Sequence, residues 1–327
     1  MIKKIRVEEA LGKPLLHDLT GIRKDGFKGV VFKRGHIIKE EDLEVLKDIG
    51  KENVYVGELD PGFVHEEDAI KLVAGDLAGL NVGLSGVSEG KISFISKKEG
   101  LFTINRDQLK ALNSGNVYTF ATIPSYRRVR EGDLLVGARI IPLFTKDEEV
   151  EKIKAISDKY GPCFNVHPFK KLKVSVIITG SEVYYGRIKD MFEPVIRKKL
   201  RDFDHDIIGI KKCPDDMTLI EEAARDYLDK GSDLLVFSGG MSVDPDDLTP
   251  SVIRKLSDQF ISQGLPVQPG NMLTIGKARG AYLVGVPGAS MHADFTSFDI
   301  FLPRIFAGLD IKKEDFVELG EGGLLNH

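Results

Sequence analysis

The second half of the chain alternates short apolar runs with segments whose apolar residues recur at helical spacing. Residues 173–179, 206–211 and 233–237 are apolar runs of strand length. Between the last two, residues 218–230 repeat apolar side chains every three or four positions, as an amphipathic helix does, and Gly231 provides its stop. This alternation predicts an α/β fold, a three-layer domain whose mainly parallel sheet is covered by helices on both faces.

The same pattern predicts the remaining elements of this domain. A helix is expected where Ile188, Met191, Phe192, Val195, Ile196 and Leu200 recur at helical spacing. A second helix is expected over 250–263, ending at Gly264, and a last one over 290–307. Two short strands are expected over 272–275 and 281–286.

The first 170 residues have a different pattern. A short helix is expected over 7–11, and a small α/β unit follows with a helix over 40–49 and a strand from Val54. Residues 75–145 are rich in glycine and β-formers, which indicates a β-rich module resembling a partial barrel. Its expected strands are 91–96 and 100–105, paired around residues 97–100, together with 116–123 and 133–141.

These differences divide the chain into five expected segments. They are an α/β unit over 1–74, the β-rich module over 75–146, a charged, helix-prone connector over 147–171, the α/β domain over 172–310 and a tail over 311–327.

Composition narrows the class of protein. With 42% hydrophobic and 29% charged residues the chain is an ordinary globular protein, and its net charge of −4 provides no general attraction to nucleic acid or anionic membranes. Its apolar runs are far shorter than a membrane span, and acidic residues stand where a signal peptide needs its apolar region. The two cysteines are far apart and form no metal-binding CxxC motif, so we expect a cytoplasmic protein.

The most informative local feature is the turn Ser238-Gly239-Gly240-Met241-Ser242, which follows an apolar strand and precedes a helix start near Pro250. Glycines there let backbone N–H groups approach a bulky anion at the carboxyl end of a strand, where open α/β sheets bind ligands. Asp244, Asp246 and Asp247 have the wrong charge for a bare phosphate. They indicate either a divalent cation or favourable charge at the start of the helix.

Other strand ends carry similar turns. These are Thr179-Gly180-Ser181-Glu182, Cys213-Pro214-Asp215-Asp216, Gln268-Pro269-Gly270-Asn271 and Val286-Pro287-Gly288-Ala289-Ser290. In a parallel sheet they converge on one edge, so Glu182, Asp215, Asp216 and Asp247 are expected around one crevice. Each turn also has a purely local interpretation, because aspartates cap helices and Pro-Gly pairs are common turns.

Taken in order, these turns resemble the molybdopterin-binding domain shared by molybdopterin adenylyltransferases, molybdopterin molybdotransferases and competence-damage-inducible proteins. The resemblance covers residues 172–308. The family pattern Asp-Ser-Asn here reads Asp190-Met191-Phe192, the third glycine of the Gly-Gly-x-Ser-x-Gly segment is Asp244, and Leu-Pro-Gly-Asn-Pro reads Val286-Pro-Gly-Ala-Ser290. Residues 7–12 resemble the helix that opens molybdotransferases, and the chain is expected to be a shortened or divergent member.

The resemblance implies that molybdopterin, its adenylylated form or the finished molybdenum cofactor binds at the strand-end crevice. Ser238, Gly239, Gly240 and Ser242 would donate to the phosphate, and Pro287-Gly288 would let the backbone approach the pterin. The full set of implied binding residues is Thr179, Gly180, Asp190, Asp215, Asp216, Ser238, Gly239, Gly240, Met241, Ser242, Pro269, Gly270, Pro287 and Gly288.

Two functions remain open under this resemblance. The first is cofactor biosynthesis by a molybdotransferase-like reaction, in which Glu182 and Asp247 are catalytic and hold Mg²⁺ at the pterin phosphate. The second is a non-catalytic protein that stores, delivers or senses the cofactor, with a molybdoenzyme or a biosynthetic protein as partner. Relatives imply a homo-oligomer. Neither a histidine metal site nor a P-loop is supported, and Arg127, Arg128 and Arg130 are interpreted as a solvated face.

Overall fold

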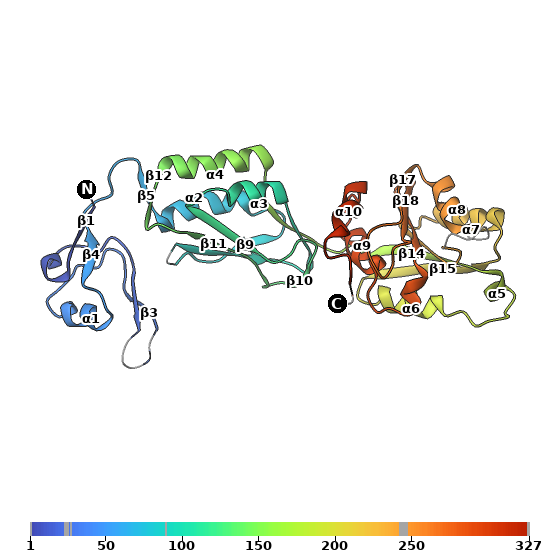
Figure 1. Ribbon diagram of the computed structural model, residues 1–327, viewed down its shortest axis with the longest axis horizontal. Coiled ribbons are helices and arrows are strands. Elements are labelled where there is room, and N and C mark those ends of the chain that lie inside the picture. Colours follow the sequence, from blue (N-terminus) through green and yellow to red (C-terminus); the bar gives the residue numbers. More distant parts are fainter. Residues whose placement is uncertain (1, 23–25, 27, 89, 242–247, 326–327) are drawn as a thin grey trace. The chain divides into compact units, whose positions relative to one another are not determined.

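Figure 1 shows the computed structural model, which describes residues 2–22, 26, 28–88, 90–241 and 248–325. The chain divides into two compact units. Unit 1 comprises residues 1–98 and 102–166, and unit 2 comprises residues 99–101 and 167–327. None of the helices in the described part of the chain combines the length and apolarity that a membrane crossing requires.

Unit 2 is built on a mixed, mostly parallel sheet of six strands, ordered β15-β14-β16-β19-β18-β17. The first four strands are parallel, while β18 runs antiparallel to both of its neighbours. In spatial order the strands span His205–Cys213, Leu172–Thr179, Leu234–Ser238, Ala281–Val286, Thr274–Ala278 and Gln259–Gln263. The mainly parallel sheet predicted from the alternating pattern is confirmed.

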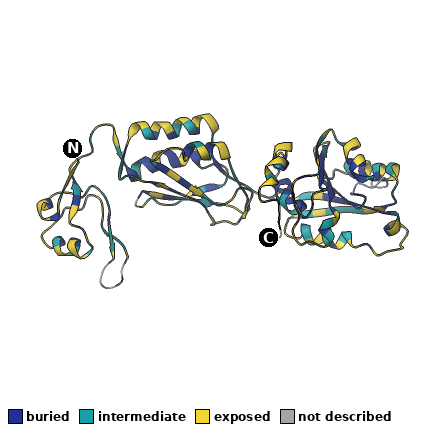
Figure 2. Cartoon of the chain, in the orientation of Figure 1, coloured by how far each residue is buried: buried dark blue, intermediate teal, exposed yellow. Residues whose placement is uncertain are grey.

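Helices cover both faces of this sheet. Alternate residues of β14, β16 and β19 pack in one core with α6 (Phe192–Leu200) and α9 (Ser297–Phe306). The intervening residues pack in a second core with α7 (Met217–Asp229) and α8 (Thr249–Leu256). Every residue of β16 and β19 is buried, as central strands between two helical layers should be. Figure 2 colours the chain by burial and shows exposed residues mainly on the outer helices. The shorter helices of unit 2 are α5 (Ser181–Tyr184), η2 (Gly288–Met291), α10 (Lys313–Val317) and η3 (Glu318–Gly320).

Unit 1 begins with small two-stranded sheets around a compact apolar core. Strand β1 pairs with β4 and β2 pairs with β3, and the core includes Val7, Leu15 and Leu46. The elements are β1 (Lys3–Arg6), η1 (Val7–Ala10), β2 (Leu19–Ile22), β3 (Lys28–Phe32), α1 (Asp42–Asp48) and β4 (Asn53–Val56).

The rest of unit 1 has a four-stranded antiparallel sheet ordered β6-β7-β11-β9. Smaller sheets are β10-β8-β13 and β12-β5. The strands are β5 (Phe63–His65), β6 (Val82–Leu84), β7 (Lys91–Ser96), β8 (Gly100–Ile104), β9 (Tyr118–Thr122), β10 (Arg128–Val129), β11 (Leu134–Ile140), β12 (Phe144–Lys146) and β13 (Phe164–His167). Helices α2 (Glu66–Leu77), α3 (Arg106–Leu112) and α4 (Asp147–Tyr160) contribute Val73, Leu112 and Val150 to the same core.

Several local predictions in unit 1 are wrong. The strands over 91–96 and 100–105 exist, but β7 and β8 lie in different sheets and do not pair around residues 97–100. The pattern also missed α2 and α3, and the boundary expected between residues 74 and 75 falls inside α2. By contrast, the segment over 147–159 is helical as its composition predicts, and as α4 it contributes buried residues to the core of unit 1.

The helix predicted over 250–263 in unit 2 is correct only in its first half. Helix α8 ends at Leu256, where the Ser257 hydroxyl donates to the Ile253 carbonyl and Ser257 itself is extended. Residues 259–263 form the edge strand β17 instead. The apolar pair Phe260-Ile261 suits either element, and pairing with β18 determines the outcome.

Two other helices begin later than predicted. Helix α6 starts at Phe192, because Asp190 Oδ1 accepts the Phe192 N–H at 2.8 Å, so Ile188 and Met191 are exposed outside it. Helix α9 starts at Ser297, where Thr296 and Asp299 form a capping box, and residues 288–291 are a separate 3-10 turn.

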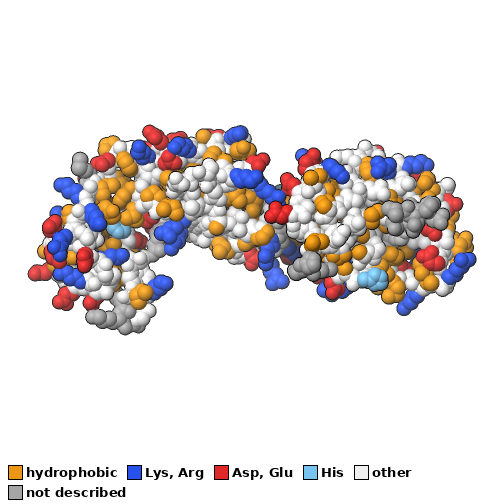
Figure 3. Space-filling view, in the orientation of Figure 1, with side chains coloured by type: hydrophobic (Ala, Val, Ile, Leu, Met, Phe, Trp, Pro, Cys, Tyr) orange, Lys and Arg blue, Asp and Glu red, His pale blue; other side chains and the backbone are white. Residues whose placement is uncertain are grey.

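Acidic and basic side chains are interspersed over the face of the molecule shown in Figure 3. Arg127, Arg128 and Arg130 are exposed.

Candidate functional site

The parallel strands of unit 2 bring four of the predicted turns to one edge of the sheet. Thr179 pairs with Cys213, Ile178 pairs with Ser238, and Ser238 pairs with Val286. The last residues of β14, β15, β16 and β19 are therefore aligned, and the chain leaves the sheet at a common edge. Residues separated by more than a hundred positions in sequence meet there.

The turn after β16 is held tightly between β14 and α8. Gly239 has a φ of +89°, and a Cβ at this position would lie 2.1 Å from the Thr179 carbonyl oxygen. The Thr249 hydroxyl donates to the Gly239 carbonyl at 2.9 Å, and it lies 3.2 Å from the Thr179 hydroxyl. Because no side chain fits at Gly239, this position requires glycine for both backbone conformation and space.

The predicted residues around this turn differ in exposure. Gly239 and Gly240 are half-buried, whereas the Ser238 side chain is fully buried and its hydroxyl has no hydrogen-bond partner among the described residues. Thr179 is also buried, and its hydroxyl donates to the Ser238 carbonyl at 3.3 Å. Ser242 and Asp247 lie outside the described residues, as do Asp244 and Asp246.

Asp215 and Asp216, two predicted residues in the turn after β15, accept hydrogen bonds from backbone N–H groups. Asp215 Oδ2 accepts the Ser181 N–H at 2.7 Å, and the Asp215 N–H donates to the Ser181 hydroxyl oxygen at 3.2 Å. Asp216 caps α7 by accepting the N–H groups of Thr218 and Leu219. The local interpretation of Asp215 and Asp216 as turn and helix-capping residues therefore describes their present contacts.

Asp190 is buried, and its side chain stabilises the start of α6. Its Oδ1 accepts the Phe192 N–H, while its Oδ2 lies 3.6 Å from Lys212 Nζ and has no hydrogen bond among the described residues. Glu182 is exposed on α5. Within the described ranges there is no group of three or more His, Cys, Asp or Glu side chains that could hold a metal ion.

A hollow of about 370 Å³ opens at this edge of the sheet. Its walls come from four places: the start of α6, the Gly-Gly turn, the loop before β18 and the turn after β19. The lining residues are Phe192, Gly239, Gly240, Met241, Asn271, Met272, Pro287, Gly288 and Ala289. Its volume lies within the roughly 300–1,000 Å³ typical of small-molecule sites.

Five predicted residues line this hollow, namely Gly239, Gly240, Met241, Pro287 and Gly288. Thr179, Gly180, Asp190, Asp215, Asp216, Ser238, Pro269 and Gly270 are not among its lining residues. The set of implied binding residues omitted Phe192, Asn271, Met272 and Ala289, each of which lies within two residues of a predicted position. The quoted motifs contained Phe192, Asn271 and Ala289, and Met272 follows directly after one of them.

Met241 forms a fixed part of the hollow. It is buried, and it packs over β19 where Gly285 has no side chain. A Cβ at Gly285 would lie 2.5 Å from both the Met241 Sδ and Cε atoms. The glycine in the middle of a buried strand therefore makes the space in which Met241 sits.

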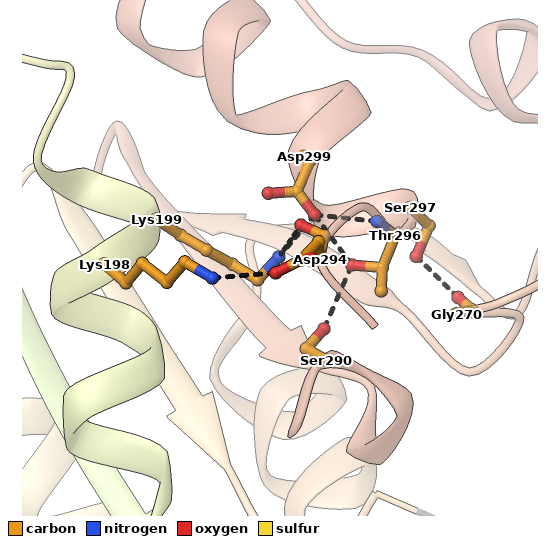
Figure 4. A network of polar contacts seen from close by, with 8 residues as sticks. All are labelled: Lys198, Lys199, Gly270, Ser290, Asp294, Thr296, Ser297 and Asp299. Carbon is orange, nitrogen blue, oxygen red and sulfur yellow. Dashed lines mark hydrogen bonds and ion pairs between the residues drawn. The ribbon is translucent and has the colours of Figure 1, made fainter. Parts of the chain in front are cut away.

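A buried polar network holds the turn after β19, as Figure 4 shows. Asp299 Oδ2 is 2.6 Å from Lys199 Nζ, and it also accepts the Thr296 N–H at 2.7 Å and the Thr296 hydroxyl at 3.0 Å. The Thr296 hydroxyl lies 3.0 Å from the Ser290 hydroxyl, at the end of η2. The network thus links α6, which carries Phe192, to the segment that carries Pro287 and Gly288.

The turn at Pro269-Gly270 is attached to the same helix end. The Ser297 hydroxyl donates to the Gly270 carbonyl, as Figure 4 shows, and Gly270 has a φ of +109°. A Cβ at Gly270 would lie 2.6 Å from the Ser297 hydroxyl oxygen. Gly270 therefore positions the loop that carries Asn271 and Met272, although it does not itself line the hollow.

The two cysteines do not have the environment of reactive thiols. Cys213 ends β15 near this edge, but burial raises the pKa of its thiol, and burial raises the pKa of Cys163 to about 12. Both thiols are therefore protonated at neutral pH, which leaves little nucleophilic thiolate.

Comparison with known proteins identifies the domain that contains the hollow. A family model described as "Probable molybdopterin binding domain" matches residues 175–307, and a model for a domain of unknown function matches residues 4–58. A molybdopterin molybdenumtransferase of Haemophilus influenzae is 25% identical over 224 residues, which are 63% of this chain and 52% of that protein. The one from Staphylococcus aureus strain Mu50 is 27% identical over 155 residues, covering 45% of this chain and 36% of that protein.

The chain thus spans about half the length, or less, of these curated relatives. Among solved structures, the molybdopterin biosynthesis enzyme MoaB from Thermus thermophilus is 21% identical with a TM-score of 0.35, covering 40% of this chain and 90% of that chain. Residues 175–307 contain the hollow and all four of its walls. What the comparison identifies is therefore a molybdopterin-binding domain over residues 175–307, not the identity of the whole chain.

Proposed function

We propose that this protein binds molybdopterin or the molybdenum cofactor in the hollow at the carboxyl edge of the unit 2 sheet, and that it acts in cofactor biosynthesis. The observation that carries the proposal is the position of the hollow between the Gly-Gly turn and the Pro-Gly turn of the matched domain. The backbone N–H groups of Gly239 and Gly240 suit the phosphate, because no side chain screens them.

A direct titration tests the binding. Purified protein is titrated with molybdopterin and compared with Gly240→Asp, which adds a negative charge and a side chain to the wall of the hollow. We expect the variant to bind at least tenfold more weakly, a difference of about 1.4 kcal/mol. Gly115→Asp in unit 1 is the matched control, because a Cβ at Gly115 meets no atom within 4 Å. Equal affinity of wild type and Gly240→Asp contradicts the proposed site.

The catalytic form of the proposal is Mg²⁺-dependent insertion of molybdenum. Glu182, exposed on α5, and Asp247 would hold the ion, since Mg²⁺ prefers carboxylate oxygens and retains several waters. The bound ion would supply charge stabilisation at the phosphate. Asp247→Asn removes a charge at nearly constant size, and we expect it to bind pterin while losing Mg²⁺-dependent insertion by more than about tenfold. Unchanged insertion at limiting Mg²⁺ contradicts this assignment.

The alternative is a non-catalytic protein that stores, delivers or senses the cofactor. It is favoured by the carboxylates of Asp215 and Asp216, which already accept backbone N–H groups, and by Phe192, which stands where the related pattern has an amide. A wild-type protein that binds the pterin but inserts no molybdenum supports this alternative. Transfer of the bound cofactor to an apo-molybdoenzyme would then distinguish delivery from storage and sensing.

A further inference from the structure

The hollow has an unusual lining for the site of a highly polar ligand. Among the described residues, no charged side chain lines it, and the only polar side chain in its walls is that of Asn271. Phe192, Met241, Met272 and Pro287 face it from four separate segments of unit 2. Such a lining provides few hydrogen bonds to the edge of a bound ring and a large apolar surface for its face.

Phe192 is held in position before any ligand binds. Its N–H donates to Asp190 Oδ1, which fixes the first residue of α6, and its ring packs partly against the core between α6 and α9. The ring is half-buried, so part of it remains available to the hollow. An aromatic side chain fixed on both sides loses little conformational freedom when a planar ligand covers it.

Two other walls of the hollow are also fixed. Met241 is packed over Gly285, and Pro287 is followed by η2, whose Ser290 is attached to the buried Lys199–Asp299 network. Thioether sulfurs make favourable contacts with the edges of aromatic rings, and proline contributes a rigid apolar face. Walls of this kind match a flat heteroaromatic ring in the approximately 370 Å³ available.

We infer that Phe192 is the residue of this site that binds the ring: the flat ring of the pterin lies against the Phe192 side chain, and the phosphate reaches the Gly239-Gly240 backbone. Recognition of the ring is then by its face rather than by hydrogen bonds to its edge. This inference rests on the proposed function, because it identifies which part of the same ligand each wall contacts.

The test uses the full chain and two probes, molybdopterin and free pterin, which has the ring but no phosphate. Binding of pterin is followed by quenching of its fluorescence. We expect Phe192→Leu, which keeps the apolar volume but not the aromatic face, to weaken both ligands about tenfold. Phe192→Tyr keeps the ring and should retain wild-type affinity within about twofold. Phe192→Asn, which introduces an amide at this position, should weaken both ligands at least as much as Phe192→Leu.

Two controls accompany this test. The first shows whether losing any half-buried aromatic ring of unit 2 weakens binding, and the second shows whether the ring and the phosphate bind at separate positions. Phe203 is also half-buried in unit 2, but it lies outside the hollow and stacks on Phe306 with the ring centroids 4.4 Å apart. Phe203→Leu should therefore leave the affinities for molybdopterin and free pterin unchanged. Inorganic phosphate should compete with molybdopterin but not with free pterin.

The outcomes are distinguishable. Failure of the wild type to bind molybdopterin contradicts the proposed function itself. Binding of molybdopterin by wild type and Phe192→Leu with equal affinity overturns the role of Phe192 and leaves the proposed function standing. The inference is also overturned if phosphate displaces free pterin, or if wild type binds molybdopterin but not free pterin.

Discussion

The two units of this chain arrange similar local turns in different ways. In unit 2 the four parallel strands β15, β14, β16 and β19 end at one edge, so turns from distant parts of the sequence form a single hollow. In the four-stranded sheet of unit 1, all neighbours are antiparallel and successive strand ends alternate between two edges. A turn motif is therefore informative about function only when the topology collects several such motifs in one place.

The difference extends to the interactions that hold the turns. In unit 2 the network of Lys199, Asp299, Thr296 and Ser290 connects α6 to residues about a hundred positions later. In unit 1 the ion pair between Arg34 and Asp68 has both side chains substantially exposed, at 37% and 50%. The Lys199 and Asp299 side chains are only 6% and 15% exposed, so the same type of contact has different consequences in the two units.

The largest expected effect is the loss of this buried pair. Lys199→Met retains most of the side-chain volume but leaves the Asp299 carboxylate without its ammonium partner. Removal of one member of a buried ion pair costs about 3–5 kcal/mol, because the remaining charge is poorly solvated. We expect the free energy of unfolding of unit 2, measured by urea titration, to fall by about this amount.

Two exposed pairs provide controls. Lys198→Met removes the neighbouring pair with Asp294, whose side chains are 60% and 93% exposed, and Arg34→Met removes the pair with Asp68 in unit 1. Each should change the free energy of unfolding by no more than about 1 kcal/mol. If all three variants lose the same free energy of unfolding, the burial of the Lys199–Asp299 pair does not make it more stabilising than the two exposed pairs.

The second expected effect concerns acid stability and lies in unit 1. Burial, with a smaller contribution from the Arg34 charge, lowers the pKa of His65 to about 4. The folded state therefore keeps His65 neutral, while the unfolded chain takes up a proton near pH 6.5. The free energy of unfolding is therefore not reduced by His65 above about pH 6.5, and it falls progressively as the pH drops toward 4. The total loss from this group is at most about 3 kcal/mol.

His65→Asn isolates this effect. His65 Nδ1 accepts the Glu67 N–H at 3.3 Å as the N-cap of α2, and asparagine provides a substitute acceptor without a titrating group. Urea unfolding at about pH 7.5 and about pH 4.5 should show a smaller loss of stability for the variant than for wild type. Parallel losses in the two proteins would mean that His65 does not contribute to the acid sensitivity of unit 1.

Much of unit 2 could be predicted from its sequence, because apolar strands and glycine-containing turns alternate there in a regular order. The predicted strands over 173–179 and 233–237 correspond to β14 and β16, and the predicted turns after them lie at one edge. Two predictions failed for different reasons. Residues 259–263 became a strand because β18, which lies later in the sequence, offers an edge for pairing. Ile188 lies outside α6 for a local reason, because Asp190 Oδ1 accepts the Phe192 N–H and starts the helix later.

The side chains that line the hollow were harder to predict than its backbone. The glycines and prolines of the turns could be predicted from the sequence, because each of these residue types favours particular backbone conformations. Phe192 and Met272 have no such signature, because an apolar residue in a helix or loop is usually a core residue. Phe192 is positioned by the local contact between its N–H and Asp190. Met272 depends on the Gly270–Ser297 contact, which joins residues 27 positions apart and forms only in the folded chain.

The smallest expected effect compares one glycine from each unit. Gly239→Ala places a methyl group 2.1 Å from the Thr179 carbonyl oxygen at a φ of +89°, so the turn must move. We expect the affinity for molybdopterin to fall about a hundredfold, or about 2.7 kcal/mol, because the phosphate site is made of backbone whose geometry cannot be kept. Gly137→Ala in β11 meets no atom within 4 Å and should instead stabilise unit 1 by about 0.5–1 kcal/mol, since alanine is less costly than glycine to order in a strand. Affinity and the urea midpoint of each variant are measured together. Retention of wild-type affinity by Gly239→Ala would show that the turn can relax without losing its ligand. Binding would then not require a rigid turn at the common strand edge, which is the feature that distinguishes unit 2 from unit 1.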